Sequence, residues 1–340
     1  MKLVTFSVLN AYPRQERIGA VEGDKVIDLA AAYRAWLLDS GKSDINAVYS
    51  IAGALLPHDM TAFLEGGDVS MEAARQAVAF AKNVSVDIVK EEKICYSSDE
   101  VKLHAPVPRP RLLRDFILFE DHLKNGLRMV YTRKGETPPE NLEVPPIIKK
   151  IPIYYKGNPS TIIGPEETVV WPSYSKVMDY ELEFACVIGK RGRDISAKDA
   201  GKYIAGFTIF NDWSARDKQI EESEGGLGPA KGKDFCTAIG PYLVTPDEIE
   251  NVYNLNMEVR VNGELRGQGN SGAMLRTFEE IIEYVSQSET LVPGDILASG
   301  TVGSGSGFEM GRQLEDGDVV ELTIGSLGTL RNRVIFAKSL

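Results

Sequence analysis

Hydrophobic and polar positions alternate along residues 177–189, whose sequence is VMDYELEFACVIG. Every even position from Met178 to Ile188 is apolar or aromatic, as expected for the buried face of an element. The odd positions carry Asp179, Glu181 and Glu183 before they become apolar again. Side chains of a β-strand point alternately to opposite faces, so the pattern predicts a strand with one core face. Three acidic side chains would then lie in a row on its other face.

Alternation of the same kind predicts β-structure through most of the chain after residue 105. Further strands are expected at residues 161–173, 205–212, 238–245, 254–269, 295–302 and 316–337, with Asn262-Gly263 as a hairpin turn. Helical spacing is seen at residues 196–204 and 274–288. We therefore expect an α+β, mainly β fold, in which a sandwich or roll of strands has helices at its edges.

The first hundred residues have a different pattern. Residues 17–29 predict two short strands around a turn, and residues 60–67 and 70–83 predict helices. Prolines at positions 106, 108 and 110 indicate an extended join to the part that follows. The sequence thus predicts a small α+β domain over residues 1–105 and a larger β-rich domain over residues 106–340.

Composition narrows the class of partner. The chain of 340 residues has a net charge of −11 and no basic cluster, which argues against nucleic acid or acidic membranes as partners. It is compatible with a small anionic substrate, which a few local cations can bind. No apolar run reaches the 18 or so residues of a membrane span, and the N-terminus resembles a first strand rather than a signal peptide. Three widely spaced cysteines predict free thiols in a reducing, cytoplasmic compartment.

The row of acidic side chains has two explanations. An antiparallel strand with one wet face would place Asp179, Glu181 and Glu183 in solvent. Like charges two residues apart on one face are only about 6.5 Å apart, however, and repel one another. The alternative is a hard cation such as Mg²⁺, Mn²⁺ or Ca²⁺, which takes carboxylate oxygens as ligands.

Two other segments carry candidate chemistry. Residues 207–219, FTIFNDWSARDKQ, place Asp212, Arg216 and Gln219 directly after an apolar strand. A turn with a helix-capping Asp212 explains them, but an acid, a guanidinium and an amide also suit an anionic substrate and its metal. In residues 114–126, His122 follows Asp115; it is either an ordinary surface or core histidine or a proton carrier.

Four segments together resemble the fumarylacetoacetate hydrolase family. They are DYELEFACVIG (179–189), FNDWSARDKQ (210–219), LGPAKGKDFCTAIGPYLV (227–244) and ASGTVGSGSGFEMG (298–311). The resemblance covers about residues 105–340 in the family's order. It implies a mixed β-sandwich roll preceded by a small, variable N-terminal α+β domain, and homodimers are usual in the family.

The resemblance also implies roles for particular residues. The implied ligands of a divalent cation, Mg²⁺ first and Mn²⁺ or Ca²⁺ as alternatives, are Asp115, Glu181, Glu183 and Asp212. The implied catalytic residues are His122 with Glu309 as its orienting carboxylate, Lys233 as an oxyanion donor, and Arg216. The implied substrate-binding residues are Gln219, Thr301 and Tyr155. Asp179 is expected to be a neighbour of the ligands rather than a ligand.

The implied activity is metal-dependent hydrolysis of a C–C bond in a β-diketo acid, such as an acylpyruvate or a fumarylacetoacetate-like compound, in aromatic-compound catabolism. The alternative is a decarboxylase, isomerase or hydratase of 2-oxo acids that uses the same metal site. Three positions depart from the pattern of the tyrosine-catabolic enzyme: Ile117 and Ser223 stand where it has tyrosines, and Asn158 where it has an arginine. These departures put fumarylacetoacetate itself in doubt as the substrate.

Overall fold

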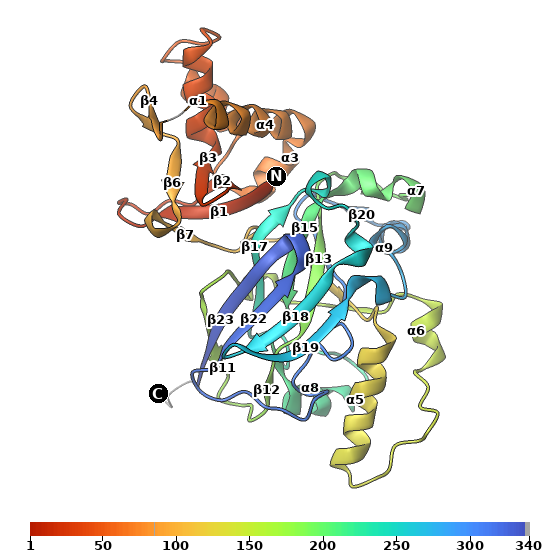
Figure 1. Ribbon diagram of the computed structural model, residues 1–340. Coiled ribbons are helices and arrows are strands. Elements are labelled where there is room, and N and C mark those ends of the chain that lie inside the picture. The colour runs from red at the N-terminus through yellow and green to blue at the C-terminus, as the bar shows by residue number, and fades with distance from the viewer. Residues whose placement is uncertain (85, 337–340) are drawn as a thin grey trace.

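A large mixed sheet runs through the whole molecule in the computed structural model, which describes residues 1–84 and 86–336 (Figure 1). Its strands lie in the order β6 (Cys95–Ser97), β3 (Lys25–Asp28), β2 (Arg17–Glu22), β1 (Lys2–Val8), β17 (Thr237–Val244), β15 (Ile204–Asn211), β13 (Leu182–Ile188), β21 (Ile296–Ala298), β8 (Leu113–Phe116) and β9 (Tyr154–Lys156). In addition, β7 (Val101–Leu103) pairs with β1, and β10 (Ile162–Ile163) pairs with β17.

A second sheet packs against one face of the first. It has the order β11 (Thr168–Trp171), β23 (Gly328–Phe336), β22 (Val319–Ile324), β18 (Asn256–Val261) and β19 (Glu264–Asn270). Two-stranded ribbons are formed by β12 (Met178–Asp179) with β16 (Ser214–Ala215), β14 (Gly192–Arg193) with β20 (Thr290–Leu291), and β4 (Ile88–Val89) with β5 (Glu92–Lys93). The turn between β18 and β19 is the predicted Asn262-Gly263 hairpin, in which both residues have positive φ.

Among the described residues, four α-helices belong to the N-terminal part and five to the larger part (Figure 1). Those of the N-terminal part are α1 (Leu29–Asp39), α2 (Val48–Leu55), α3 (Met60–Glu65) and α4 (Gly67–Asn83). Along one side of the larger part are α5 (Glu120–Arg133) and α6 (Pro146–Lys150), and the remainder are α7 (Ala197–Ala200), α8 (Arg216–Ser223) and α9 (Phe278–Ser286). The α+β class with mixed, face-to-face sheets is therefore as predicted. None of these helices in the described chain combines the length and the apolar character that a membrane crossing requires.

Strand β13 has the core face that its sequence predicts, and its other face is buried as well. Its even residues, from Leu182 to Ile188, belong to the core between the two sheets. Its odd residues Ala185 and Val187 belong to a second core, which contains apolar side chains of the N-terminal helices. One strand through residues 177–189 was nevertheless the wrong prediction. Residues 178–179 pair with β16, and Glu181 forms only an isolated bridge with Ser306, because the chain changes partners before β13 begins.

The N-terminal part is joined to the rest by backbone pairing as well as by packing. Strand β1 pairs with β17 through Lys2↔Val244 and Leu3↔Leu243. The apolar side chains of α1 to α4 share a core with Phe210, Ile239 and Ala298 of the larger part. The predicted boundary between residues 105 and 106 falls in the loop after β7, and it stays a prediction; the last four residues of the second predicted domain, 337–340, lie outside the described residues.

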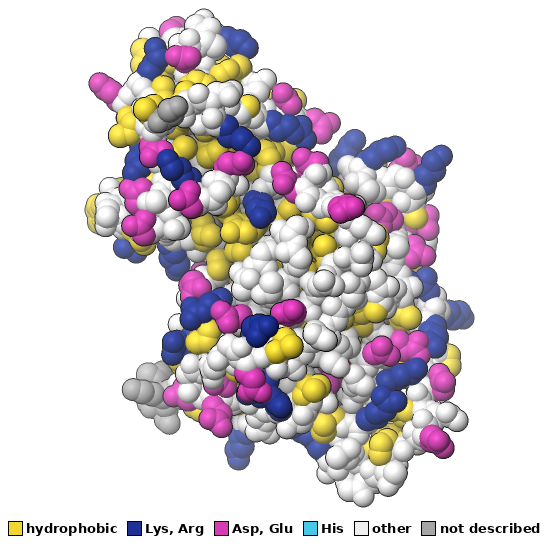
Figure 2. All heavy atoms as spheres, viewed as in Figure 1, with side chains coloured by type: hydrophobic (Ala, Val, Ile, Leu, Met, Phe, Trp, Pro, Cys, Tyr) yellow, Lys and Arg dark blue, Asp and Glu magenta, His cyan; other side chains and the backbone are white. Residues whose placement is uncertain are grey.

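Acidic and basic side chains are interspersed on the face of the molecule shown in Figure 2. A surface of this kind offers no large region of positive potential on that face. It agrees with the composition, which argues against a nucleic-acid partner.

Candidate metal centre and active site

Three carboxylates on or next to three strands of the large sheet meet in one place. Asp115 lies on β8, Glu183 on β13, and Asp212 directly after β15. One oxygen of each lies within 4.8 Å of the others, and all three residues are buried. Because β21 separates β8 from β13 by one strand, side chains of this length can converge across it. Fold topology thus brings together residues that are far apart in the chain.

The free oxygens of this cluster fit a hard cation. One oxygen of each carboxylate, namely Oδ1 of Asp115, Oε2 of Glu183 and Oδ1 of Asp212, is buried without a hydrogen-bond partner among the described residues. A buried anionic oxygen without a partner is costly, and a divalent cation with oxygen ligands relieves that cost. The donor set is all oxygen, which suits Mg²⁺, Mn²⁺ or Ca²⁺ better than softer metals.

Electrostatics of the cluster point the same way. Burial raises the pKa of Asp115 well above its ordinary value, and the charge of Asp212 raises it further. Burial and the charges of Asp115 and Glu181 likewise hold the pKa of Glu183 well above its ordinary value. The pKa of Asp212 is raised by burial, although Lys233 opposes the shift. Without a cation, the three carboxylates cannot all ionise at low cost, so a bound cation would complete the site.

Glu181 lies beside this cluster but is bound to cations of the protein. It accepts hydrogen bonds from Nζ of Lys233 and, at 2.7 Å, from Nη2 of Arg216. Burial raises the pKa of Glu181, but Arg216 and Lys233 outweigh it and lower that pKa overall. Nζ of Lys233 also lies 2.5 Å from Oδ2 of Asp212, so the lysine bridges Glu181 to the cluster. Glu181 as a fourth ligand stays a prediction.

Arg216 at the start of α8 holds its neighbours in place. Its Nε donates to Asp179 at 2.8 Å, its Nη2 to Glu181, and its Nη1 to Oε1 of Gln219 at 2.8 Å. All three nitrogens therefore donate to groups of the protein. These contacts suit the fixing of Glu181, a candidate ligand, better than the binding of a substrate carboxylate.

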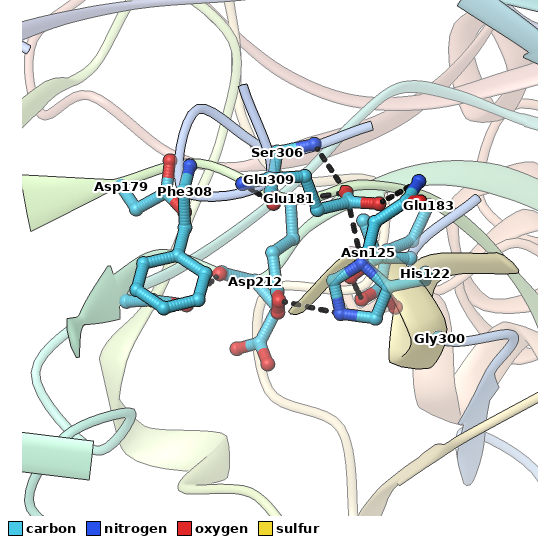
Figure 3. A network of polar contacts seen from close by, with 12 residues as sticks. His122, Asn125, Asp179, Glu181, Glu183, Asp212, Gly300, Ser306, Phe308 and Glu309 are labelled. Carbon is cyan, nitrogen blue, oxygen red and sulfur yellow. Dashed lines mark hydrogen bonds and ion pairs between the residues drawn. The ribbon is translucent and has the colours of Figure 1, made fainter. Parts of the chain in front are cut away.

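His122 lies in the first turn of α5, between two carboxylates. Its Nδ1 lies 2.9 Å from Oε2 of Glu309, and its Nε2 lies 3.5 Å from Oε1 of Glu181 (Figure 3). Glu309 also accepts from the backbone N–H of Ser304 at 2.9 Å and of Ser306 at 3.0 Å. Burial raises the pKa of Glu309, but His122 and the backbone N–H of Ser304 outweigh burial and lower that pKa overall. The arrangement orients the imidazole so that Nε2 faces Glu181, beside the acidic cluster.

An open cavity with about 700 Å³ of empty space gives access to these groups. Nine of the eleven predicted site residues line it: Asp115, His122, Tyr155, Glu181, Glu183, Arg216, Gln219, Lys233 and Thr301. The lining also includes apolar side chains, among them Ile117, Leu123, Ile153 and Pro229. Two of the predicted substrate-binding residues touch the acidic cluster. Tyr155 donates to Oδ2 of Asp212 at 2.7 Å, and Thr301 donates to Oε1 of Glu183 at 3.1 Å.

The departures from the family pattern fall in different places. Ile117 lines the cavity, where it contributes an apolar surface instead of a phenol. Asn158 donates to the backbone carbonyl of Asp234 at 3.2 Å, and the hydroxyl of Ser223 donates to the carbonyl of Gln219 at 2.8 Å. These two side chains therefore support the local backbone. Of these three residues, only Ile117 is part of the cavity lining.

Two polar residues of the site had no predicted role. Asn125, one turn after His122, donates to Oε1 of Glu309 at 3.1 Å. Asp179, expected only as a neighbour, accepts hydrogen bonds from Arg216 and from two backbone N–H groups of the loop that carries Glu309. For Asn125, the sequence held one indication: it stands three residues after His122 on a helix, and residues at this spacing share a face. For Asp179, no neighbouring residue in the sequence indicated its hydrogen bonds with Gly307 and Phe308.

A buried acidic cluster, a histidine–carboxylate pair and a lysine around one cavity are consistent with an enzyme site that holds a divalent cation. The chain belongs to the fumarylacetoacetate hydrolase family: the family model "Fumarylacetoacetate (FAA) hydrolase C-terminal" matches residues 122–335. The resemblance deduced from the sequence motifs is thereby confirmed.

Relatives of known name are similar over most of the chain. The mitochondrial oxaloacetate tautomerase Fahd2a of Rattus norvegicus is 35% identical over 285 residues, which cover 82% of this chain and 80% of the relative. The oxaloacetate tautomerase YisK of Bacillus subtilis is 34% identical over 281 residues, which cover 82% and 87%. Among solved structures, fumarylacetoacetate hydrolase from Exiguobacterium antarcticum matches with a TM-score of 0.67 and 25% identity, covering 98% of this chain and 100% of that one.

Metal binding is expected to stabilise the protein, and more so at higher pH. In the metal-free protein the raised pKa values of Asp115 and Glu183 mean that stability is lost as the pH rises above the unfolded values of about 4. A bound cation removes this loss, and it competes with protons for the ligands. At one hundred times Kd the gain is about 2.7 kcal/mol. Thermal unfolding with and without Mg²⁺ or Mn²⁺, from about pH 5 to about pH 8, should show a shift that grows with pH. A shift of equal size at both ends of this range would contradict the assignment.

Proposed function

We propose that the protein is a divalent-cation-dependent tautomerase that interconverts the keto and enol forms of a small 2-oxo acid, with oxaloacetate as the first compound to test. The observation that carries the proposal is the position of His122, whose Nε2 faces the acidic cluster across the cavity while Nδ1 contacts Glu309. The names of the relatives support the same chemistry. This is the isomerase alternative from the sequence, and the comparisons support it better than the C–C hydrolase.

Asp115, Glu183 and Asp212 would hold the cation, with Glu181 as the fourth candidate. A bound divalent cation supplies Lewis acidity that polarises the carbonyl of a 2-oxo acid. The chain's own groups then transfer the proton. His122 takes a proton from the carbon next to the carbonyl and returns it to the oxygen, so that one proton moves and no bond between heavy atoms breaks.

Other side chains stabilise the charge that develops on oxygen. Lys233 is held between Glu181 and Asp212; burial lowers its pKa, but the two carboxylates outweigh burial and raise that pKa overall. It therefore stays an ammonium donor. The amide nitrogen of Gln219 is a second donor, because its Oε1 is engaged by Arg216. Preorganised donors of this kind contribute about 3 kcal/mol each to transition-state stabilisation.

A C–C hydrolase is the second candidate, and the His122–Glu309 contact of 2.9 Å supports it. The same pair could activate water to attack a β-diketo acid, as the family resemblance implies, and a role in aromatic-compound catabolism belongs to this candidate. Among the described residues that line the cavity there is no serine or cysteine, so neither candidate uses such a nucleophile. The homodimer expected from the family is part of the proposal and is tested by mass measurement in solution.

The two candidates differ in their products. We expect the Mg²⁺- or Mn²⁺-loaded protein to speed the loss of enol absorbance of freshly dissolved oxaloacetate, with the mass unchanged. It should also speed exchange of the C3 protons into D₂O. A panel with acylpyruvates is measured in parallel. Release of pyruvate and a free acid from an acylpyruvate, without tautomerisation of oxaloacetate, would overturn the proposal in favour of the hydrolase, and release of CO₂ would indicate a decarboxylase.

A further inference from the structure

A buried carboxylate outside the acidic cluster joins three parts of the site. Asp179 is the second residue of β12 and is 2% exposed. Its Oδ1 accepts from the backbone N–H of Gly307 at 2.8 Å, and its Oδ2 accepts from the N–H of Phe308 at 3.1 Å and from Nε of Arg216 at 2.8 Å. The side chain thus connects α8 to the loop of residues 304–309, which we call the Glu309 loop.

The Glu309 loop is closely packed against Asp179 and its neighbours. A Cβ atom at Gly307 would lie 2.7 Å from Oδ1 of Asp179 and 2.6 Å from the carbonyl of Arg312, so only glycine fits there without a shift. The ring of Phe308 lies with its centroid 5.5 Å from Cζ of Arg216 and 4.6 Å from Cζ of Arg133 on α5. The next residue is Glu309, whose Oε2 lies 2.9 Å from Nδ1 of His122.

Figure 3 shows the order of these groups: Asp179 and Phe308 lie at one end of the network, and His122 and Asn125 lie at the other, with Glu309 and Ser306 between them. Two backbone hydrogen bonds to one carboxylate fix the loop at residues 307 and 308, directly before Glu309. Charge-assisted bonds of this kind are stronger than neutral ones. A shift of the loop would move the carboxylate that orients His122.

We propose that Asp179 is a positioning residue, which holds the Glu309 loop and Arg216 in one arrangement so that Glu309 orients His122 while Arg216 fixes Glu181. It acts through these neighbours and does not itself meet the substrate. The role of Asp179 in a reaction rests on the proposed function. Its effect on the orientation of His122 does not depend on which reaction the protein catalyses.

The test uses the imidazole of His122 as a probe, because the chain has only three histidines. The holoprotein is labelled with ¹⁵N-histidine, and the signal of His122 is identified by its loss in His122→Ala. We expect Asp179→Asn to move the His122 ring signals in the direction that Glu309→Gln moves them. Gly307→Ala disturbs the same contact from the loop side without removing a charge, and it should do likewise even if Asp179→Asn folds poorly.

The matched control is Asp217→Asn. Asp217 on α8 accepts from the hydroxyl of Ser175 at 2.5 Å and from the N–H of Lys176 at 2.8 Å. The same change therefore removes a similar set of hydrogen bonds, to partners outside the Glu309 loop. The Asp217→Asn variant should leave the His122 signals in place. Unmoved signals in both Asp179→Asn and Gly307→Ala, or an equal shift in Asp217→Asn, would overturn the proposal.

A kinetic measurement follows where the wild-type protein turns over a 2-oxo acid. Loss of an outer partner of a catalytic group costs about 10- to 100-fold, so kcat of Asp179→Asn should fall by that factor and more than KM rises. The double variant with Glu309→Gln should lose less than the product of the two single losses, because both act on His122. Losses that multiply would contradict action through Glu309. Absence of turnover in the wild type would count against the proposed function alone, since the histidine signals still report on Asp179.

Discussion

Glu183→Gln is expected to abolish metal-dependent turnover almost completely while making the metal-free protein more stable. Glu183 is one of the three carboxylates of the buried cluster, and its Oε2 has no hydrogen-bond partner among the described residues. An amide in its place removes one of the charges that balance a divalent cation. The loss of several kcal/mol of Lewis-acid stabilisation corresponds to about a 10³-fold fall in kcat/KM.

The rise in stability follows from the sign of the pKa shift. The folded-state pKa of Glu183 is raised by burial and by Asp115, so its ionisation near neutral pH disfavours the folded state. Glutamine cannot ionise and avoids this cost. Thermal unfolding in EDTA should therefore show a higher Tm for Glu183→Gln than for the wild type at pH 7, and Mg²⁺ or Mn²⁺ should no longer raise it. The exposed Glu250→Gln is the matched control. A metal-dependent Tm shift that survives in Glu183→Gln would place the cation elsewhere.

His122→Ala is expected to lower kcat by about 10²- to 10⁴-fold, the range for removal of a general acid–base group, and to leave the metal-dependent Tm shift in place. The imidazole lies near Glu181, and His122 does not belong to the group of three carboxylates that could hold the cation. Turnover of the oxaloacetate enol and metal titration by thermal unfolding together measure both properties. Glu309→Gln should cost less, about 10- to 100-fold, because it only orients the ring.

The control for this histidine is His58→Ala, which changes an exposed residue of the N-terminal part. Two results would be at odds with the assignment. If His122→Ala tautomerises oxaloacetate at the wild-type rate, the proton carrier is another group. If it also fails to respond to the metal, His122 supports the metal centre and its kinetic effect says nothing of proton transfer.

Local patterns were enough to predict β13 and its core face, because alternation depends only on neighbouring residues; they did not predict that the other face is buried too. They were not enough at residues 178–181. There the chain leaves one partner for another, and the direction of Asp179 follows from its pairing with β16 and from the Glu309 loop, which lies far along the sequence. The approach of Asp115, Glu183 and Asp212 was predictable from the family motifs alone. Periodicity cannot show which strands become neighbours.

The contacts of Lys233 with both Glu181 and Asp212 could not be predicted from the sequence either. A lysine in GKDF is equally consistent with a substrate contact, and only the positions of the two carboxylates show that the protein itself neutralises it. The same holds for Arg216, whose three donating nitrogens all meet protein acceptors. Charge balance is a property of the folded site, so residue identities alone cannot fix it.

The continuity of the large sheet limits how this chain could be shortened or recombined. A cut in the loop after β7 looks natural from the prolines, yet it would strip β1 from residues 243–244 of β17 and would uncover the apolar face on which Ala185 and Val187 lie. An unpaired strand end beside a bare hydrophobic face invites edge-to-edge aggregation. We therefore expect that residues 106–340 do not fold as a minimal enzyme on their own, and that chimaeras with relatives should exchange the N-terminal part together with the surface of the sheet that it covers.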